Sequence, residues 1–328
     1  MRAANHLSLA PRVRTITSEK DSLMLRRRFF SRVLLVSLSF AVVVATATSR
    51  ADEPKSAVPP ITQGQRIFTC GHSFHVFVYA MLPELADSAG IKDQEMVGIS
   101  RIGGSRVIQH WDVPDDKNIA KPALREGKVD VLTLSPIWLP DDGIEKFITL
   151  AAEHNPNVRV LVQEYWLPND TYEPIYPLDT RKKVDHNATD VNELRKKNAA
   201  YCRDIEEHVR AINKKNGRDV AYVVPVGVAS VALREKIVAG KAPGLKAQWD
   251  LFRDTWGHAK PALMTLSAYC HFAVIYRRSP VGLAVPEALK RDKEIPEDQK
   301  EALNRLLQKL AWEAVRNHPL TGIESAAR

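Results

Sequence analysis

From Arg66 onward the chain alternates between two patterns of hydrophobic and polar positions. Short, mostly apolar runs are typical of buried parallel strands. Longer segments with apolar residues three and four positions apart are typical of amphipathic helices. The runs that predict strands are Arg66–Cys70, Glu95–Ser100, Val129–Leu134, Asn157–Gln163 and Val220–Val226. The segments that predict helices are Phe74–Ala86, Lys117–Glu126, Asp142–Glu153, Asp190–Lys215, Ser230–Ala239, Pro261–Tyr276 and Glu297–Arg316. This order indicates an α/β fold, a three-layer sandwich with helices on both faces of a doubly wound, mostly parallel, five-stranded sheet.

Composition divides the chain into three parts. Residues 65–328 carry the α/β pattern and are predicted to form a single domain, preceded by a proline-containing linker at residues 52–64. Residues 168–189 interrupt the pattern with three prolines, several charges and no apolar period. Such a composition is typical of loops, so we predict a surface excursion there.

Residues 1–51 have the features of an export signal. Arg26–Arg28 precede the apolar run Val33–Ala45, which is too short to cross a membrane comfortably. Ser49 and Ala51 place small residues at the −3 and −1 positions of a cleavage site. The arginines, followed by two phenylalanines, also resemble the twin-arginine export pattern. We therefore expect a periplasmic or extracellular protein. An uncleaved signal anchor is the alternative, and it would be the only membrane attachment.

The charge of the chain is concentrated in its first residues. The formal net charge is +8, but residues 1–51 hold nine Lys or Arg and two Asp or Glu, which leaves 38 basic and 37 acidic residues for the rest. That nearly neutral remainder shows no basic stripe interleaved with aromatic residues, so we expect no nucleic-acid partner. The cysteines Cys70, Cys202 and Cys270 allow one disulfide at most and lack metal-site spacing. We predict no metal site, and the oligomeric state stays open.

The candidate chemistry starts at Gly71-His72-Ser73, where the first predicted strand gives way to a helix. A serine at such a turn can project its hydroxyl from the carboxyl edge of the sheet, close to free N–H groups of the first helical turn. Because those groups can stabilise an oxyanion, the position suits a nucleophile; a helix N-cap is the alternative role for Ser73. Asp254-Thr-Trp-Gly-His258, much later in the chain, offers a base with an orienting carboxylate.

The order of these elements resembles the GDSL/SGNH hydrolase family. The family has a Gly-Asp-Ser after its first strand, a glycine after the second, an Asn after the third, and an Asp and a His before the last helix. The resemblance covers about residues 66–283 and implies an ester hydrolase with Ser73 as nucleophile, His258 as base, Asp254 as the orienting acid, and no cofactor. Asp254 and His258 stand one residue further apart than the family's Asp-x-x-His. If Asp254 does not reach the ring, a Ser-His dyad is the alternative.

The resemblance also implies an oxyanion hole. Gly104 matches the family's second block, so its N–H would join that of Ser73, with Gly103 as the alternative. The third block lacks its Asn, and Ser135 is the candidate for that donor; otherwise the hole has two backbone donors. Losing one donor costs roughly 2.7–4 kcal/mol of transition-state stabilisation. His72 stands where the family usually has Asp.

Two tryptophans at strand ends, Trp138 and Trp166, are predicted to bind substrate together with His72. Aromatic rings there would suit stacking on sugar faces, whereas tryptophans that seal loops onto the core are the alternative. We expect His110 and His186 to be surface groups. The sequence thus predicts an exported serine esterase acting on a small-molecule or carbohydrate ester. A catalytically degenerate SGNH-fold protein that binds carbohydrate is the alternative, and a metal-dependent hydrolase is disfavoured because no ligand cluster is recognised.

Overall fold

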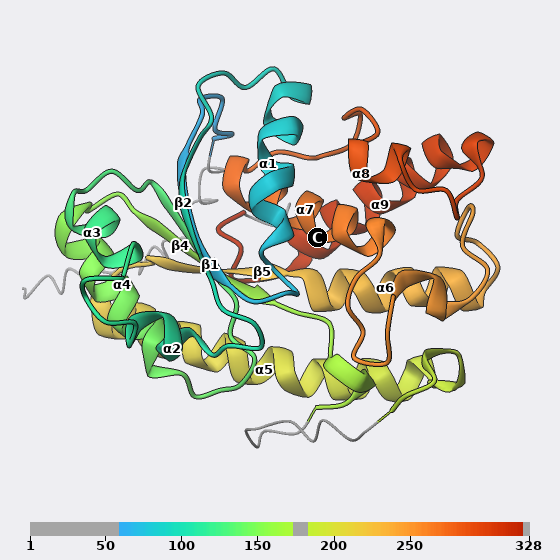
Figure 1. The fold of residues 1–328 in the computed structure, drawn as a ribbon, viewed down its shortest axis with the longest axis horizontal. Helices are drawn as coiled ribbons and strands as arrows, with labels where there is room; N and C mark the ends of the chain where they lie inside the picture. The colour runs from blue at the N-terminus through green and yellow to red at the C-terminus, as the bar shows by residue number, and fades with distance from the viewer. Residues whose placement is uncertain (1–58, 173–182, 324–328) are drawn as a thin grey trace, which may run out of the picture. The chain divides into compact units, whose positions relative to one another are not determined.

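The computed structural model describes residues 59–172 and 183–323. Its five strands form one fully parallel sheet in the order β2-β1-β3-β4-β5 (Figure 1). The strands are β1 Arg66–Gly71, β2 Glu95–Arg101, β3 Val131–Leu134, β4 Arg159–Glu164 and β5 Ala221–Pro225. This is the order of flavodoxin-like doubly wound sheets, and it confirms the predicted fold class.

Helices cover both faces of the sheet, as the alternating pattern predicts. On one side α2 and α3 pack against α4, and α5 packs against β5 and α6; on the other side α1 and α9 pack against α7 (Figure 1). The helices are α1 Phe77–Ser88, α2 Val107–Trp111, α3 Ala120–Arg125, α4 Asp142–His154, α5 Val191–Asn216, α6 Val226–Val238, α7 Pro261–Tyr276, α8 Glu287–Lys290 and α9 Glu297–Asn317. Helix α7 is apolar all round because it contacts α1, α6, α9 and β5.

The local sequence sets where several elements begin and end. The side chain of Asp190 accepts the N–H groups of Asn192 and Glu193, which caps the start of α5. Gly217 ends the same helix in the left-handed region, with φ of 66°. Helix α1 begins at Phe77, later than predicted, because the N–H groups of His75 and Val76 first close a turn on the carbonyl of His72.

The parallel register brings the carboxyl ends of the strands to one edge. Gly71 of β1 lies opposite Arg101 of β2, and Glu164 of β4 lies opposite Pro225 of β5. Strands β3 and β4 are buried along their whole length, which is expected for parallel strands with helices on both faces. The residues after these strand ends therefore meet in space although they lie far apart in the sequence.

Two predictions concern residues only partly described. The export segment, residues 1–51, and residues 52–58 of the linker lie outside the described residues, as do 173–182 within the predicted excursion. No helix in residues 59–172 or 183–323 is long and apolar enough to span a membrane. The prediction of a surface location is wrong for Pro168, Asn169, Asp170 and His186, which are buried, although other described residues of the excursion, such as Lys183 and Asn187, are exposed. Asp170 and His186 look like surface residues in the sequence, but they are buried because they bond to each other.

Candidate active site

Ser73 lies in the turn between β1 and α1, at the carboxyl edge of the sheet. The turn is tight because His75 folds back beneath it: a Cβ on Gly71 would lie 2.6 Å from Cδ2 of His75. Only glycine fits that position without a shift of the imidazole ring. Ser73 itself is half-buried, so its hydroxyl is held by the turn and still reaches the surface.

Ser73, His258 and Asp254 form one continuous chain of hydrogen bonds. Oγ of Ser73 lies 2.9 Å from Nε2 of His258, and Nδ1 of His258 lies 2.7 Å from Oδ2 of Asp254. Because a carboxylate accepts only, Nδ1 carries the ring proton and Nε2 is left to accept from the serine hydroxyl. The structure thus brings together the three residues that the sequence analysis selected for a nucleophile, a base and an orienting acid.

The extra residue between Asp254 and His258 does not separate them. Oδ1 of Asp254 accepts the N–H groups of Trp256, Gly257 and His258, each at 3.1 Å, so the segment curls around the carboxylate. The curl needs Gly257, whose φ is +89°. Burial alone would raise the pKa of Asp254, but hydrogen bonds from the backbone and ring of His258 hold it below the ordinary value. Asp254 therefore reaches the ring of His258, so the condition for the alternative Ser-His dyad is not met.

Trp166 holds the segment that carries His258 through a hydrogen bond and through ring packing. Its Nε1 donates to the carbonyl of Gly257 at 2.7 Å, and its ring stacks on Phe74 with centroids 4.8 Å apart and an interplanar angle of 7°. The Phe74 ring in turn meets the imidazole of His258 edge-on, at 5.1 Å. Trp166 is only 3% exposed, so its surface is used for packing within the protein.

The other two side chains predicted to bind substrate are also buried, Trp138 at 5% and His72 at 2% exposure. Nδ1 of His72 accepts the N–H of Phe74 at 3.3 Å, which leaves Nε2 to donate to Oγ of Ser135 at 3.1 Å. Burial lowers the pKa of His72 to about 3, so the ring is neutral. His72 links the serine turn to the end of β3. With so little exposed surface, these side chains offer a substrate almost no contact area in this conformation.

The predicted oxyanion donors lie at neighbouring strand ends. Gly104 follows β2 and Ser73 follows β1, and no N–H of either residue donates to another group within residues 59–172 and 183–323. Gly104 is exposed with φ of +60°, and a Cβ added there would meet no atom within 4 Å. Ser135 is buried with its oxygen on His72, and the described residues show no contact between Ser135 and Ser73. The backbone N–H groups of Ser73 and Gly104 thus have no acceptor within the described residues, and their role as an oxyanion hole stays a prediction.

His110 braces the turn that carries Gly104. Its ring nitrogens bond to the hydroxyls of Ser100 at 2.7 Å and Ser105 at 2.8 Å, on either side of that turn. Burial lowers the pKa of His110 to about 4. The prediction that His110 is a surface group is wrong. The available sequence signal was the apolar Val107, three positions before His110, because residues with that spacing share one face of a helix.

A second buried network, missed by the sequence analysis, holds the serine turn from β4. Gln163 donates through Nε2 to the carbonyl of Phe74 at 3.1 Å and accepts from Nδ1 of His75 at 2.7 Å. Nε2 of His75 lies 2.9 Å from the hydroxyl of Thr133 on β3. A glutamine directly after the apolar run Val160–Val162 of a predicted strand was the available signal, because a buried amide needs polar partners.

The residues after β4 clamp the segment that carries Asp254. Asp170 accepts from Arg234 at 2.5 and 2.9 Å, and its Oδ2 lies 2.9 Å from Nδ1 of His186. Nε2 of His186 lies 3.2 Å from the carbonyl of Asp254, and Asn169 donates its N–H to the carbonyl of Trp256 at 3.1 Å. His186 is fully buried, so the prediction that it is a surface group is wrong.

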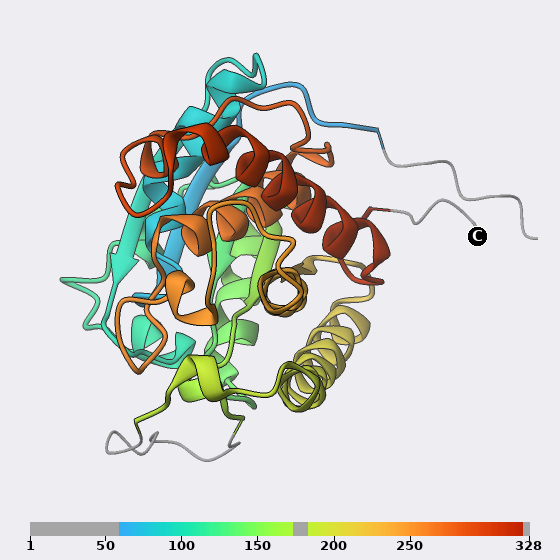
Figure 2. The ribbon, with the colours of Figure 1, turned by 90° about the vertical axis from the view of Figure 1, so that its right-hand side faces the viewer.

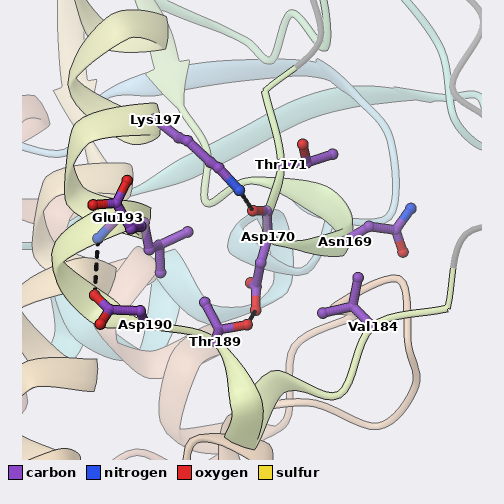
Figure 3. Close-up of a pocket in the computed structure, with 9 residues that line it drawn as sticks. Asn169, Asp170, Thr171, Val184, Thr189, Asp190, Glu193 and Lys197 are labelled. Atoms are coloured by element: carbon purple, nitrogen blue, oxygen red, sulfur yellow. Dashed lines mark hydrogen bonds between the residues drawn. The ribbon is translucent and has the colours of Figure 1, made fainter.

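Figure 3 shows the surroundings of this clamp, with Thr189 and Lys197 bonded to Asp170. A cavity of about 310 Å³ borders these residues and the start of α5, and its described lining contains none of Ser73, Asp254 and His258. The cavity therefore adjoins the residues that hold the Asp254 segment in place, and it does not contact the three candidate catalytic side chains.

Comparisons with known proteins find solved structures of low sequence identity. No protein-family model matches the sequence, and no curated protein matches it. A DUF4886 family protein from Bacteroides uniformis is 16% identical, with 80% of this chain and 100% of that chain covered and a TM-score of 0.49. A candidate GDSL-like lipase from Parabacteroides merdae is 12% identical, with 65% and 96% covered and a TM-score of 0.41.

A lipase from Streptomyces rimosus is 11% identical, with 52% of this chain and 83% of that chain covered and a TM-score of 0.28. At such identities and TM-scores the likenesses say nothing about activity, which must be inferred from the side chains of this protein. In its strand order and in the placing of Ser73, Asp254 and His258, the chain resembles the GDSL/SGNH hydrolases.

Proposed function

We propose that this protein is a serine hydrolase that cleaves ester bonds, with Ser73 as its nucleophile. The observation that carries the proposal is the hydrogen-bonded chain from Ser73 through His258 to Asp254. A serine hydroxyl is a weak nucleophile until a base takes its proton, and an imidazole held in the right tautomer by a carboxylate is that base. All three groups stand at hydrogen-bond distance from one another in sequence along this chain.

The reaction follows from this geometry. Oγ of Ser73 attacks the ester carbonyl while Nε2 of His258 takes its proton, and Asp254 stabilises the resulting imidazolium. The N–H groups of Ser73 and Gly104 receive the negative oxygen of the tetrahedral intermediate. His258 then returns the proton to the leaving alcohol, and a water activated by the same ring hydrolyses the acyl-enzyme.

This geometry favours an enzyme over a binding protein with a degenerate site. A protein that only binds a glycan has no need of an imidazole hydrogen-bonded to a serine hydroxyl. Nor does it need a carboxylate such as Asp254, which holds both the backbone N–H and the ring of that histidine. We infer that the substrate is a small-molecule or carbohydrate ester met outside the cytoplasm, since residues 26–51 have the features of an export signal. The side chains of His258 and Asp254 are 25% and 38% exposed, so such an ester can reach the site from solvent.

Aryl-ester hydrolysis and labelling with a fluorophosphonate test the proposal. Wild-type protein should turn over short-chain aryl esters and carry the label on Ser73, whereas Ser73→Ala should show neither. Ser279→Ala removes a serine outside the hydrogen-bonded chain and should behave as wild type. Unchanged turnover in Ser73→Ala, or a label on another residue, would overturn the assignment.

A further inference from the structure

A second group of acidic and histidine side chains lies where β4, α5 and the segment after α9 meet. It consists of Glu164, Glu206 and His318, and we call it the Glu164 cluster. One potential ligand atom from each residue lies within 4.8 Å of the others. Figure 2 shows α5, α6 and α9 side by side, which agrees with their contacts and with the place of the cluster. The hydrolase chemistry proposed above uses none of these residues.

Three polar atoms of this cluster lack a well-formed hydrogen bond among the described residues: both carboxylate oxygens of Glu164, which is fully buried, and Nε2 of His318. The thiol of Cys202 also lies beside the Glu164 carboxylate, and burial together with that carboxylate raises the pKa of the thiol. Nε2 of His318 faces Oε1 of Glu164 at 3.3 Å and Oε1 of Glu206 at 3.4 Å, without hydrogen-bond geometry to either. Burying a carboxylate without a partner costs several kcal/mol, so native proteins give such groups a proton, a cation or a metal.

The two distances from the histidine nitrogen of the cluster match the spacing of metal ligands. Zn²⁺ binds nitrogen and oxygen at about 2.0–2.2 Å in tetrahedral geometry, which puts two ligand atoms about 3.3–3.6 Å apart. The two distances from Nε2 of His318 fall in that range. One imidazole with two carboxylates is a donor set for Zn²⁺ or a similar first-row cation, and it suits Ca²⁺ and Mg²⁺ poorly. We propose that the Glu164 cluster binds a divalent transition-metal ion of the Zn²⁺ class.

The cluster is open to solvent on one side. A cavity of about 370 Å³ between α5, α6 and α9 is bordered by Glu206 and His318. The Glu206 side chain is 25% exposed, and its Oε2 bonds to Arg210 at 3.3 Å, which leaves Oε1 for the ion. An ion can enter by this cavity, and water from it can fill the fourth position. Bound there, the ion would join β4, α5 and the residues after α9.

The proton on His318 changes place when the ion binds. Nδ1 of His318 accepts the N–H of Leu320 at 3.2 Å, so in the metal-free protein the ring proton is on Nε2, between the carboxylates. A ligating Nε2 has no proton, and the neutral ring then carries it on Nδ1. Metal loading should therefore break the Leu320 contact and shift the amide resonance of that residue.

Metal content and thermal unfolding test the inference. The protein is stripped with a chelator, equilibrated with Zn²⁺ alone, freed of excess ion, and analysed for bound zinc and for Tm. Wild type should retain one ion per chain and unfold at a higher temperature than the stripped protein. Glu164→Gln and His318→Gln should each weaken Zn²⁺ binding by more than about 100-fold. Removing a residue that only hydrogen-bonds to a metal ligand typically costs about 10- to 100-fold, and removing a ligand itself should cost more.

Two controls separate the cluster from other sources of binding. Glu313→Gln borders the same cavity outside the cluster and should retain zinc as wild type does, and so should Ser73→Ala, which tests independence from the hydrolase. If Glu164→Gln does not fold, Glu206→Gln gives the same test at a partly exposed position. If the cluster variants Glu164→Gln, Glu206→Gln and His318→Gln retain as much zinc as wild type, the proposal is overturned, and the three side chains only share protons. A loss of zinc in Glu313→Gln as large as in Glu164→Gln would also overturn it.

Discussion

Two of the regions in which a carboxylate lies next to a histidine differ in how the carboxylate is satisfied. Asp254 is 38% exposed and accepts three backbone N–H groups and the ring of His258. Glu164 is fully buried and accepts no well-formed hydrogen bond within the described residues. The hydrogen bonds of Asp254 come from the chain itself and suit proton transfer, whereas the Glu164 cluster leaves buried oxygens without a well-formed hydrogen bond, which is why we propose that it binds an ion. A histidine beside a carboxylate therefore does not by itself indicate a function. The other hydrogen bonds made by the carboxylate distinguish the two regions.

The largest expected effect tests whether the Asp254 region acts through its charge. Asp254→Asn keeps an oxygen for the three backbone N–H groups, so the segment should hold its shape while the ring of His258 loses its orienting acceptor. Ester hydrolysis should fall by about 10⁴-fold in kcat. Steady-state kinetics with an aryl ester measures this, and Asp298→Asn, an exposed aspartate, should leave the rate unchanged. A loss below tenfold would indicate a Ser-His dyad.

A third carboxylate sharpens the contrast in burial. Asp170 is 5% exposed, close to the burial of Glu164, but Arg234 and His186 satisfy it. Asp170→Asn leaves the Arg234 cation buried without its anion, which should cost about 3–5 kcal/mol of unfolding free energy in urea titrations. Glu193→Gln, which removes only an exposed ion pair with Lys196, should cost less than about 1 kcal/mol. A cost for Asp170→Asn as small as that would contradict the clamp.

The same clamp predicts the sign of a pH effect on stability. Burial alone would raise the pKa of Asp170, but hydrogen bonds from His186 and Arg234, together with their charges, hold it well below its ordinary value. The stabilisation is therefore complete above the unfolded pKa of about 3.9 and is lost as pH falls below it toward the folded pKa. Urea unfolding from pH 6 down to pH 3 should show wild type losing more stability than Asp170→Asn. Parallel curves would rule out this contribution.

The smallest effect concerns the support beneath His258. Trp166→Phe keeps an aromatic ring against Phe74 but removes the N–H that Gly257 accepts, leaving a buried carbonyl unpaired at a cost of about 1–3 kcal/mol. If about half of that is felt in the transition state, kcat falls by roughly 2- to 13-fold while KM changes little. Trp312→Phe on α9 serves as the control. A rise in KM with kcat unchanged would instead assign Trp166 to substrate binding.

Local sequence determined most of the architecture and the choice of Ser73, His258 and Asp254 as the candidate triad. Strand and helix periods are local properties, so the five strands and the residues at their ends could be predicted from the sequence. Asp254 and His258 lie four positions apart, so their pairing was visible as well. The start of α1 was less predictable because a turn of backbone hydrogen bonds precedes it.

Only the tertiary structure decided which polar groups meet. His110 and His186 look like surface residues in the sequence, yet they are buried because serine and aspartate partners reach them from other segments. Trp166 bonds to Gly257, which lies 91 residues later. Glu164, Glu206 and His318 come from three separate elements, so no spacing along the chain marks them as a group. Periodicity records which face of an element is apolar, and the partner of a buried polar atom depends on the packing of distant elements.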